Sequence, residues 1–181
     1  PGDSVVIFGM GSIGLLSLIV LLDAGVHDII CVTPTRKNMK RFSLTHEIAP
    51  DRIITPQDNL QNSLKKLTGR TDADCVVECS GSPQAIEQGL DILRKDGKFI
   101  ALGISSDNEI PFHFNIGIHK ALRIIFSSSS SRSSWETSLG ILQRNKSNVK
   151  KIISNVMKLE EWSKAYDKLE NREAVKIVLK P

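Results

Sequence analysis

The sequence predicts a doubly wound α/β fold, in which helices cover both faces of a mostly parallel sheet. Three observations predict it. Short apolar runs typical of buried strands alternate with helix-like segments along the 181-residue chain. The segments between successive runs are long enough to hold the crossover helices that parallel strands need. The first run, Ser4–Phe8, leads directly into a glycine-rich turn and then into a helix-like segment.

The apolar runs and the intervening periodic segments place the individual elements. Strands are expected at 4–8, 28–33, 51–54, 75–78, 98–102, 122–126 and 175–179, and helices at 12–24, 37–47, 60–67, 83–94, 135–143 and 159–169. Two stretches interrupt this alternation. Segment 107–118 contains Pro111 and predicts an irregular connection or an edge strand. The serine-rich segment 127–134 predicts a surface loop.

The charge of the chain does not indicate a nucleic-acid partner. The formal net charge is +4 and the isoelectric point is near 9.0. A compact basic cluster follows a helix-like run, where cations favour the helix dipole, and it has no interleaved aromatic residues. Its members are Arg144, Lys146, Lys150 and Lys151. We therefore expect these side chains to be solvated.

The remaining composition indicates a cytoplasmic domain without a membrane span. The longest apolar run, 15–22, is well short of the roughly 20 residues needed to cross a bilayer. Cys31, Cys75 and Cys79 lie in strand-like stretches, where free cysteine behaves as a small hydrophobe. No signal-peptide pattern opens the chain, and its first residues predict an excised fragment of a longer protein.

The glycine-rich turn is a G-x-G-x-x-G motif, Gly9-Met10-Gly11-Ser12-Ile13-Gly14. In this context the first glycine allows a tight turn out of the strand, and the second lets a diphosphate approach the backbone. The third allows the helix to pack closely on the strand. The helix start then offers free N–H groups and the positive end of a dipole. Strand, motif and helix together predict dinucleotide binding.

The residues after the second strand bear on the choice of cofactor. An acidic residue about 20 positions after the glycines would hold the ribose hydroxyls of NAD, but no carboxylate lies between Asp28 and Glu47. Thr35, Arg36 and Lys37 stand there instead, and the two cations suit the 2′-phosphate of NADP. NADP is therefore preferred over NAD. The alternative is that Arg36 and Lys37 are simply solvated at a helix start.

Four segments resemble the medium-chain dehydrogenase/reductase superfamily, in its zinc-type branch of sorbitol, threonine and secondary alcohol dehydrogenases. They are PGDSVVIFGMGSIGLL at 1–16, DCVVECSG at 74–81, GKFIALG at 97–103 and REAVKIVLKP at 172–181. The resemblance runs nearly end to end and implies an NAD(P)-binding Rossmann domain at 1–155. Residues 156–181 would form a C-terminal helix and strand that return to a GroES-like catalytic domain, which this chain lacks.

The resemblance also implies which residues contact the cofactor. The motif residues would line the diphosphate, the residues after the second strand the adenosine ribose, and two later strand ends the rest of the cofactor. Ordinary strand-end packing remains an alternative for the last three residues of this set. The full set is Gly9, Gly11, Ser12, Ile13, Gly14, Thr35, Arg36, Lys37, Ser80, Gly81, Leu102, Gly103 and Ile104.

The resemblance implies that the chemistry requires the whole enzyme. There, zinc in the N-terminal domain would polarise an alcohol or ketone for hydride exchange with the nicotinamide. We expect neither a catalytic residue nor a metal ligand in this chain, which alone should bind cofactor and turn over nothing. Homodimerisation is expected through the segment 110–114, which begins with Ile110 and ends with Phe114.

Three other classes of protein can share an opening of strand, glycine-rich turn and helix. A methyltransferase needs an acidic residue after the second strand, which is missing. A short-chain dehydrogenase needs Tyr-x-x-x-Lys, yet Tyr166, the one tyrosine, is followed four residues later by Glu170. An NAD(P)-sensing regulatory module remains open as the alternative function.

Overall fold

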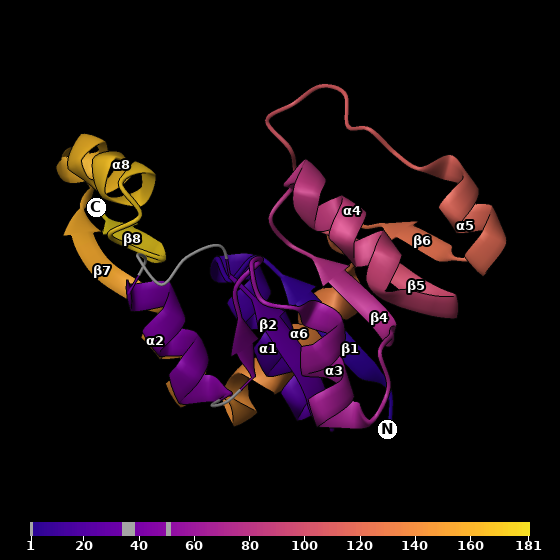
Figure 1. Ribbon diagram of the computed structural model, residues 1–181. Coiled ribbons are helices and arrows are strands. Elements are labelled where there is room, and N and C mark those ends of the chain that lie inside the picture. The colour runs from indigo at the N-terminus through magenta and orange to yellow at the C-terminus, as the bar shows by residue number, and fades with distance from the viewer. Residues whose placement is uncertain (1, 34–38, 50–51) are drawn as a thin grey trace.

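The computed structural model describes residues 2–33, 39–49 and 52–181, and within them six strands form one parallel sheet (Figure 1). The strand order is β3-β2-β1-β4-β5-β6, and every neighbouring pair is parallel. This is the doubly wound order that the sequence predicts. The strands are β1 (Ser4–Phe8), β2 (Asp28–Val32), β3 (Ile53–Ile54), β4 (Ala73–Glu78), β5 (Leu93–Ala101) and β6 (Arg123–Phe126).

Strand β1 lies at the centre because its side chains are apolar on both faces. Val5 and Ile7 pack in one apolar cluster and Val6 and Phe8 in a second, and all four are at most 3% exposed. Fully burying a side chain of this size contributes roughly 1.5–3 kcal/mol. The β1 run is therefore the anchor on which both helical layers are built.

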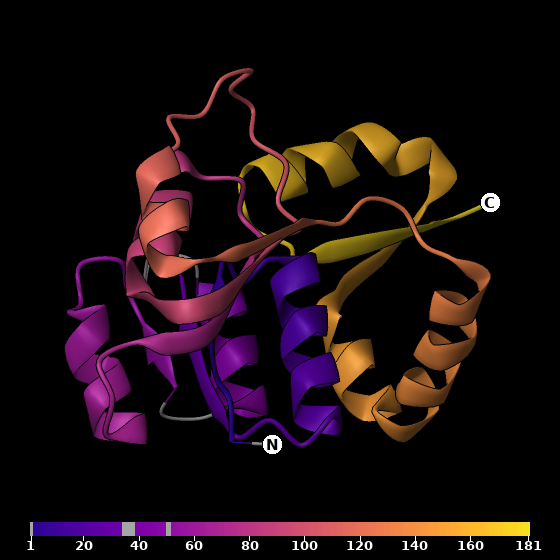
Figure 2. The same ribbon diagram turned by 90° about the vertical axis from the view of Figure 1, so that its right-hand side faces the viewer.

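Helices cover both faces of the sheet (Figures 1 and 2). The cluster with Val5 and Ile7 includes residues of α1 (Ser12–Asp23), α2 (Met39–Ile48) and α7 (Lys146–Ile152). The cluster with Val6 and Phe8 includes residues of α3 (Leu60–Thr68) and α4 (Pro83–Ile92). Two further helices, α5 (Phe114–Lys120) and α6 (Arg132–Arg144), pack against β5 and α7 respectively.

At the amino ends of the strands, Asp74 at the start of β4 links several elements through its carboxylate. Its carboxylate accepts hydrogen bonds from the Ser4 N–H at 2.8 Å and the Ser4 hydroxyl at 3.0 Å. Arg94 donates to it from Nε at 2.5 Å, and Arg70 forms a second ion pair with it. Burial raises the pKa of Asp74, but these hydrogen bonds outweigh burial and hold the pKa well below its usual 3.8.

The C-terminal residues form a separate two-stranded parallel sheet. Its strands are β7 (Ile153–Lys158) and β8 (Lys176–Lys180), joined through a 3₁₀ turn (Leu159–Glu161) and α8 (Trp162–Glu170). The Val175 N–H donates to the Ser154 hydroxyl at 2.8 Å across this unit. Figure 1 shows α8, β7 and β8 to one side of the main sheet, above α2 in this view.

Two predictions about irregular segments were right for the first part of each segment and wrong for the last. Segment 107–118 is irregular only to His113, because α5 begins at Phe114. The serine-rich segment was predicted to be a loop, yet α6 begins at Arg132, with Ser131 as its N-cap accepting from the Ser134 N–H. Serine is a preferred N-cap residue, so the serine run starts this helix. Helix α7 and strand β7 were not predicted, because 146–158 is polar and has no clear period.

Candidate functional site

The predicted glycine corner lies at the carboxyl end of β1, where the strand order reverses between β1 and β4. Gly9 has a φ of +87°, in the left-handed region that favours glycine, and its N–H donates to the Val32 carbonyl at 2.9 Å. A Cβ on Gly14 would lie 1.9 Å from the Gly9 carbonyl oxygen. The first and third glycines are therefore required by the turn and by the close packing of α1 on β1, as the motif predicts.

The second glycine, Gly11, stands in open space. A Cβ added there meets no described atom within 4 Å, and its φ of −77° suits any residue. Nothing in the local packing therefore requires a glycine at this position. A ligand that approaches the backbone closely would require one, which is the role that a diphosphate gives to this glycine.

Helix α1 begins at the same corner with its first N–H groups free. Gly11 is the N-cap and has no side chain to cap the helix, and the first helical bond runs from the Leu15 N–H to the Gly11 carbonyl at 3.0 Å. The amides of Ser12, Ile13 and Gly14 therefore have no partner within the helix. Free amides at the positive end of a 12-residue helix fit an anion. A diphosphate fits both the amides and the open position at Gly11.

The carboxyl ends of β4 and β5 lie on the other side of the glycine corner from α1. Glu78, 1% exposed, accepts hydrogen bonds from the Ser80 N–H at 2.7 Å and from the Gly81 N–H at 3.0 Å. Its backbone carbonyl accepts from the Leu102 and Gly103 N–H groups. The backbone carbonyl of Glu78 therefore joins the two strand ends, and its buried carboxylate fixes the position of the loop that follows β4.

Glycines allow these two loops to touch. Gly81 has a φ of +70°, and a Cβ on it would lie 2.3 Å from the Ile104 carbonyl oxygen. A Cβ on Gly103 would lie 2.2 Å from the Gly81 nitrogen. The Ile104 side chain is 92% exposed beside this contact. Close packing thus explains both glycines, whereas the exposure of Ile104 leaves an apolar group available to a ligand.

A cavity opens beside the glycine corner on the α4 side of the sheet. Its lining comes from the ends of β1 and β2, the turn after β3, the loop after β4 and the first turns of α4. The lining residues are Phe8, Gly9, Val32, Pro56, Ser80, Ser82, Gln84, Ala85 and Gln88. Its floor combines an aromatic, a branched aliphatic and a proline side chain, which is the kind of surface that accepts a flat heteroaromatic ring.

The structure brings most of the predicted site residues together at one edge of the sheet. The five residues of the glycine corner face the loops that hold Ser80, Gly81, Leu102, Gly103 and Ile104. Thr35, Arg36 and Lys37 lie outside the described residues. Sequence reasoning missed Glu78 and Pro56. The acidic residue in the quoted DCVVECSG segment was a signal for the first, and nothing in the local pattern pointed to the second.

Cys79, the residue that follows β4, has a partly buried thiol. Burial raises the pKa of the Cys79 thiol to about 11, and the Ser17 hydroxyl lies 3.8 Å from its sulfur. Burial also raises the pKa of the Cys31 thiol to about 12 and that of the Cys75 thiol to about 11.

Within the described part of the chain, no three histidine, cysteine, aspartate or glutamate side chains gather as they would around a metal. No helix of the described residues has the length and hydropathy of a membrane span.

Comparison with known proteins identifies the family. The model of the glucose dehydrogenase C-terminus family matches residues 1–180. A sorbitol dehydrogenase from Halalkalibacterium halodurans is 34% identical over 99% of this chain and 52% of its own length. An L-threonine 3-dehydrogenase from Caldanaerobacter subterraneus is 30% identical over 99% of the chain and 52% of its own. The crystal structure of an alcohol dehydrogenase from Thermotoga maritima superposes with a TM-score of 0.89 at 25% identity, covering 99% of this chain and 50% of its own.

The fold and the corner define a doubly wound domain of the Rossmann type. The chain belongs to the glucose dehydrogenase C-terminus family, within the zinc-type branch of the medium-chain dehydrogenase/reductases, as the sequence resemblance predicts. It spans about half the length of the curated relatives it matches. The names of these relatives give no support to the alternative of a cofactor-sensing module.

Proposed function

We propose that this chain is the nicotinamide-dinucleotide-binding domain of a zinc-type alcohol or polyol dehydrogenase. The observation that carries the proposal is the geometry of the corner at Gly9–Gly14. There is open space beside Gly11, the first amides of α1 are free, and the corner lies where the strand order of the parallel sheet reverses. In the complete enzyme, bound nicotinamide would supply the carbon that exchanges hydride with an alcohol or ketone. The zinc that polarises this substrate would belong to the N-terminal domain.

Each part of the cofactor has a matching surface on this chain. The amides of Ser12, Ile13 and Gly14 would hold the diphosphate. The cavity over Phe8, Val32 and Pro56 would take the adenine, because its floor is apolar and begins at the glycine corner. The loops that carry Ser80, Gly81, Leu102, Gly103 and Ile104 would flank the nicotinamide half.

We further propose that NADP is preferred over NAD. The support is the sequence after β2, in which Arg36 and Lys37 replace the expected carboxylate. A charge-assisted hydrogen bond from arginine to the 2′-phosphate is worth on the order of 1.5–3 kcal/mol, or tenfold or more in affinity. We expect Arg36→Ala to weaken NADP about tenfold and to leave NAD nearly unchanged. Tighter binding of NAD by the unmodified chain would contradict the preference.

Two further assignments rest on exposed apolar surface. Phe126 of the edge strand β6 is 83% exposed, and Phe112 and Phe114, just before and at the start of α5, are 43% and 67% exposed. These exposed aromatic side chains support a homodimer through 110–114, which sedimentation of the chain at several concentrations tests. In the C-terminal unit, Trp162 and Tyr166 are 57% and 61% exposed. Their exposure supports the assignment of 156–181 to the surface that meets the catalytic domain.

The proposed function is tested by isothermal titration of the chain with NADP and with NAD. We expect saturable binding of one dinucleotide per chain and no reduction of ketones by the chain with NADPH, because the metal-binding half is not included. Heat of dilution alone with both cofactors would contradict the proposal. Ketone reduction by the unaided chain would contradict the assignment of the chemistry to the other domain. We propose a cytoplasmic setting, which the free thiols of Cys31, Cys75 and Cys79 fit.

A further inference from the structure

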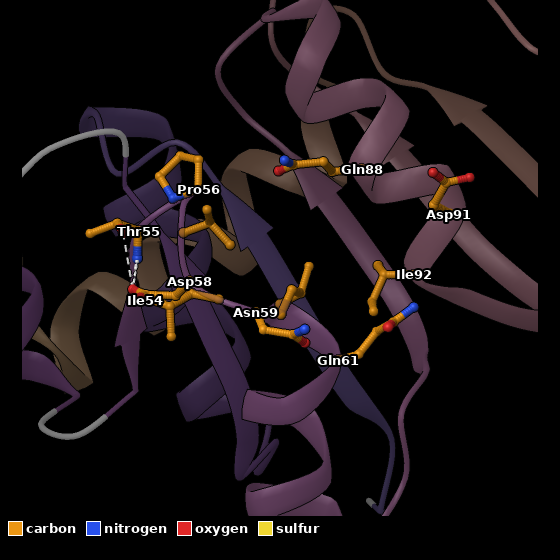
Figure 3. A pocket seen from close by; sticks show the side chains of 11 residues that line it. Ile54, Thr55, Pro56, Asp58, Asn59, Gln61, Gln88, Asp91 and Ile92 are labelled. Carbon is orange, nitrogen blue, oxygen red and sulfur yellow. Dashed lines mark hydrogen bonds between the residues drawn. The ribbon is translucent and has the colours of Figure 1, made fainter.

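A second cavity continues from the one assigned above to adenine, and the two meet at Gln88. The second cavity lies between α3 and α4, behind the turn that follows β3 (Figure 3). Its lining shares Val32, Pro56 and Gln88 with the first cavity. Beyond these residues its lining combines the polar side chains of Asn59, Gln61 and Asp91 with the apolar ones of Ile54, Leu60 and Ile92. Gln88 is therefore the polar side chain that lines both cavities.

The Gln88 side chain is available at this boundary. It is exposed, and Figure 3 shows it extending from α4 toward Pro56. Within the described residues, no side chain or backbone group hydrogen-bonds its carboxamide. The Ser80 hydroxyl in the same lining is engaged instead, since it donates to Glu78 at 2.5 Å and accepts from the Ser82 N–H at 3.1 Å.

We propose that the Gln88 carboxamide recognises the amino edge of the adenine, a deepening that rests on the proposed function. A ring whose faces lie against Phe8, Val32 and Pro56 must direct its polar edge toward a polar part of the lining, and Gln88 is the polar side chain common to both cavities. The carboxamide matches this edge in both directions. Its Oε1 accepts from the N6 amino group while its Nε2 donates to N7, the pairing by which glutamine recognises adenine in nucleic acids.

This pairing discriminates adenine from hypoxanthine. Hypoxanthine carries an oxygen at position 6, so its O6 and N7 both accept, and the single amide donor group of Gln88 can serve only one of them well. An arginine at the same position would donate to both, as arginine does toward the O6 and N7 of guanine. The identity of the residue at 88 should therefore set which base is preferred.

The experiment compares NADP with its hypoxanthine analogue by isothermal titration of the 181-residue chain. We expect the unmodified chain to bind NADP about 5- to 10-fold more tightly than the analogue. Gln88→Ala should bring this ratio close to one, and Gln88→Arg should reverse it. The matched control is Gln57→Arg, which adds the same charge in the turn after β3 at an exposed residue outside the lining of both cavities. It should keep the preference for adenine.

The outcomes separate this inference from the proposed function. A base preference that is the same in Gln88→Ala as in the unmodified chain would overturn the role of Gln88, even though both dinucleotides bind. Equal binding of both bases by the unmodified chain would also overturn it. Failure of every variant to bind either dinucleotide would instead overturn the proposed function, and the inference with it. Because Gln88 is exposed on the helix surface, neither substitution should prevent folding.

Discussion

The amino and carboxyl ends of the strands in the main sheet, called here its amino edge and its carboxyl edge, differ in how their polar groups are bonded. At the amino edge, the buried Asp74 carboxylate receives hydrogen bonds from Ser4, Arg70 and Arg94. At the carboxyl edge, Gly11 adds no side chain, and the first amides of α1 have no partner within the helix. The Asp74 carboxylate is thus bonded within the chain, whereas the first amides of α1, at the carboxyl end of β1, remain available to a ligand.

This difference indicates which residues determine the stability of the chain and which determine its affinity for a ligand. Unsatisfied polar groups cost free energy when they are buried, so free amides persist only where water or a ligand can reach them. The same β1 strand connects both edges, since it begins at Ser4 and ends at Phe8 before the corner. Substitutions at the amino edge should therefore change stability, and substitution of Gly11 should change affinity.

The largest effect is expected where the corner itself is packed. In Gly14→Ala the new Cβ would lie 1.9 Å from the Gly9 carbonyl oxygen, so α1 must move away from β1. We expect a loss of about 3 kcal/mol in the free energy of unfolding, at the upper end of overpacking costs. Cofactor affinity should fall as well. Urea unfolding measures the first effect, and a variant as stable as the unmodified chain would contradict the close packing described here.

The next largest effect is expected at the amino edge. Asp74→Asn leaves two arginines without their carboxylate, and we expect it to cost about 2 kcal/mol at pH 7. The folded-state pKa of Asp74 lies below its usual value, so its contribution is present above about pH 4 and is lost as the pH falls toward the folded-state pKa. The difference between variant and unmodified chain should therefore shrink in acid. An unchanged difference at pH 7 and pH 3 would argue against this assignment.

Gly11 provides the functional counterpart. Gly11→Ala places its Cβ in open space at an ordinary φ, so the free energy of unfolding should change by less than about 1 kcal/mol. The same methyl group would obstruct a diphosphate, and we expect NADP affinity to fall about tenfold or more. Gly117→Ala is the matched control, because its Cβ also meets nothing within 4 Å. Equal NADP affinity in both variants would contradict the assignment of the diphosphate to this corner.

The smallest effect concerns the thiols. Burial raises the pKa of Cys79 to about 11, so it stays protonated and unreactive at pH 8. We expect its alkylation in the folded chain to be slow at pH 8 and to accelerate only as the pH rises toward 11, whereas urea should release all three thiols at once. Mass spectrometry of the alkylated chain follows each cysteine. Rapid labelling of Cys79 at pH 7 would contradict its burial.

Sequence patterns predicted the parts of this fold that local chemistry determines. The β1 run, the glycine corner and α1 were placed within one residue of their observed bounds, because an apolar run, three glycines and a helix period all agree there. Strand β7 was missed, because its partner β8 lies some 20 residues later and only their pairing makes its polar residues a strand.

The same distinction explains the site. The corner could be predicted because its residues are consecutive in the sequence. The cavity beside it could not, since Phe8, Pro56 and Gln88 come from three separate elements that only the folded sheet brings together. The buried link from Glu78 to Ser80 and Gly81 likewise depends on the geometry after β4 rather than on the residue types alone. Residues 34–38, where the choice between NADP and NAD was predicted, lie outside the described structure.

The contrast between the two edges is tested most directly by residue-resolved NMR of the backbone amides during a titration with NADP. The amides of Ser12, Ile13 and Gly14 should show the largest shifts, and those of Ser4 and Asp74 should hardly move. Large shifts at the Asp74 edge with an unperturbed glycine corner would contradict the account.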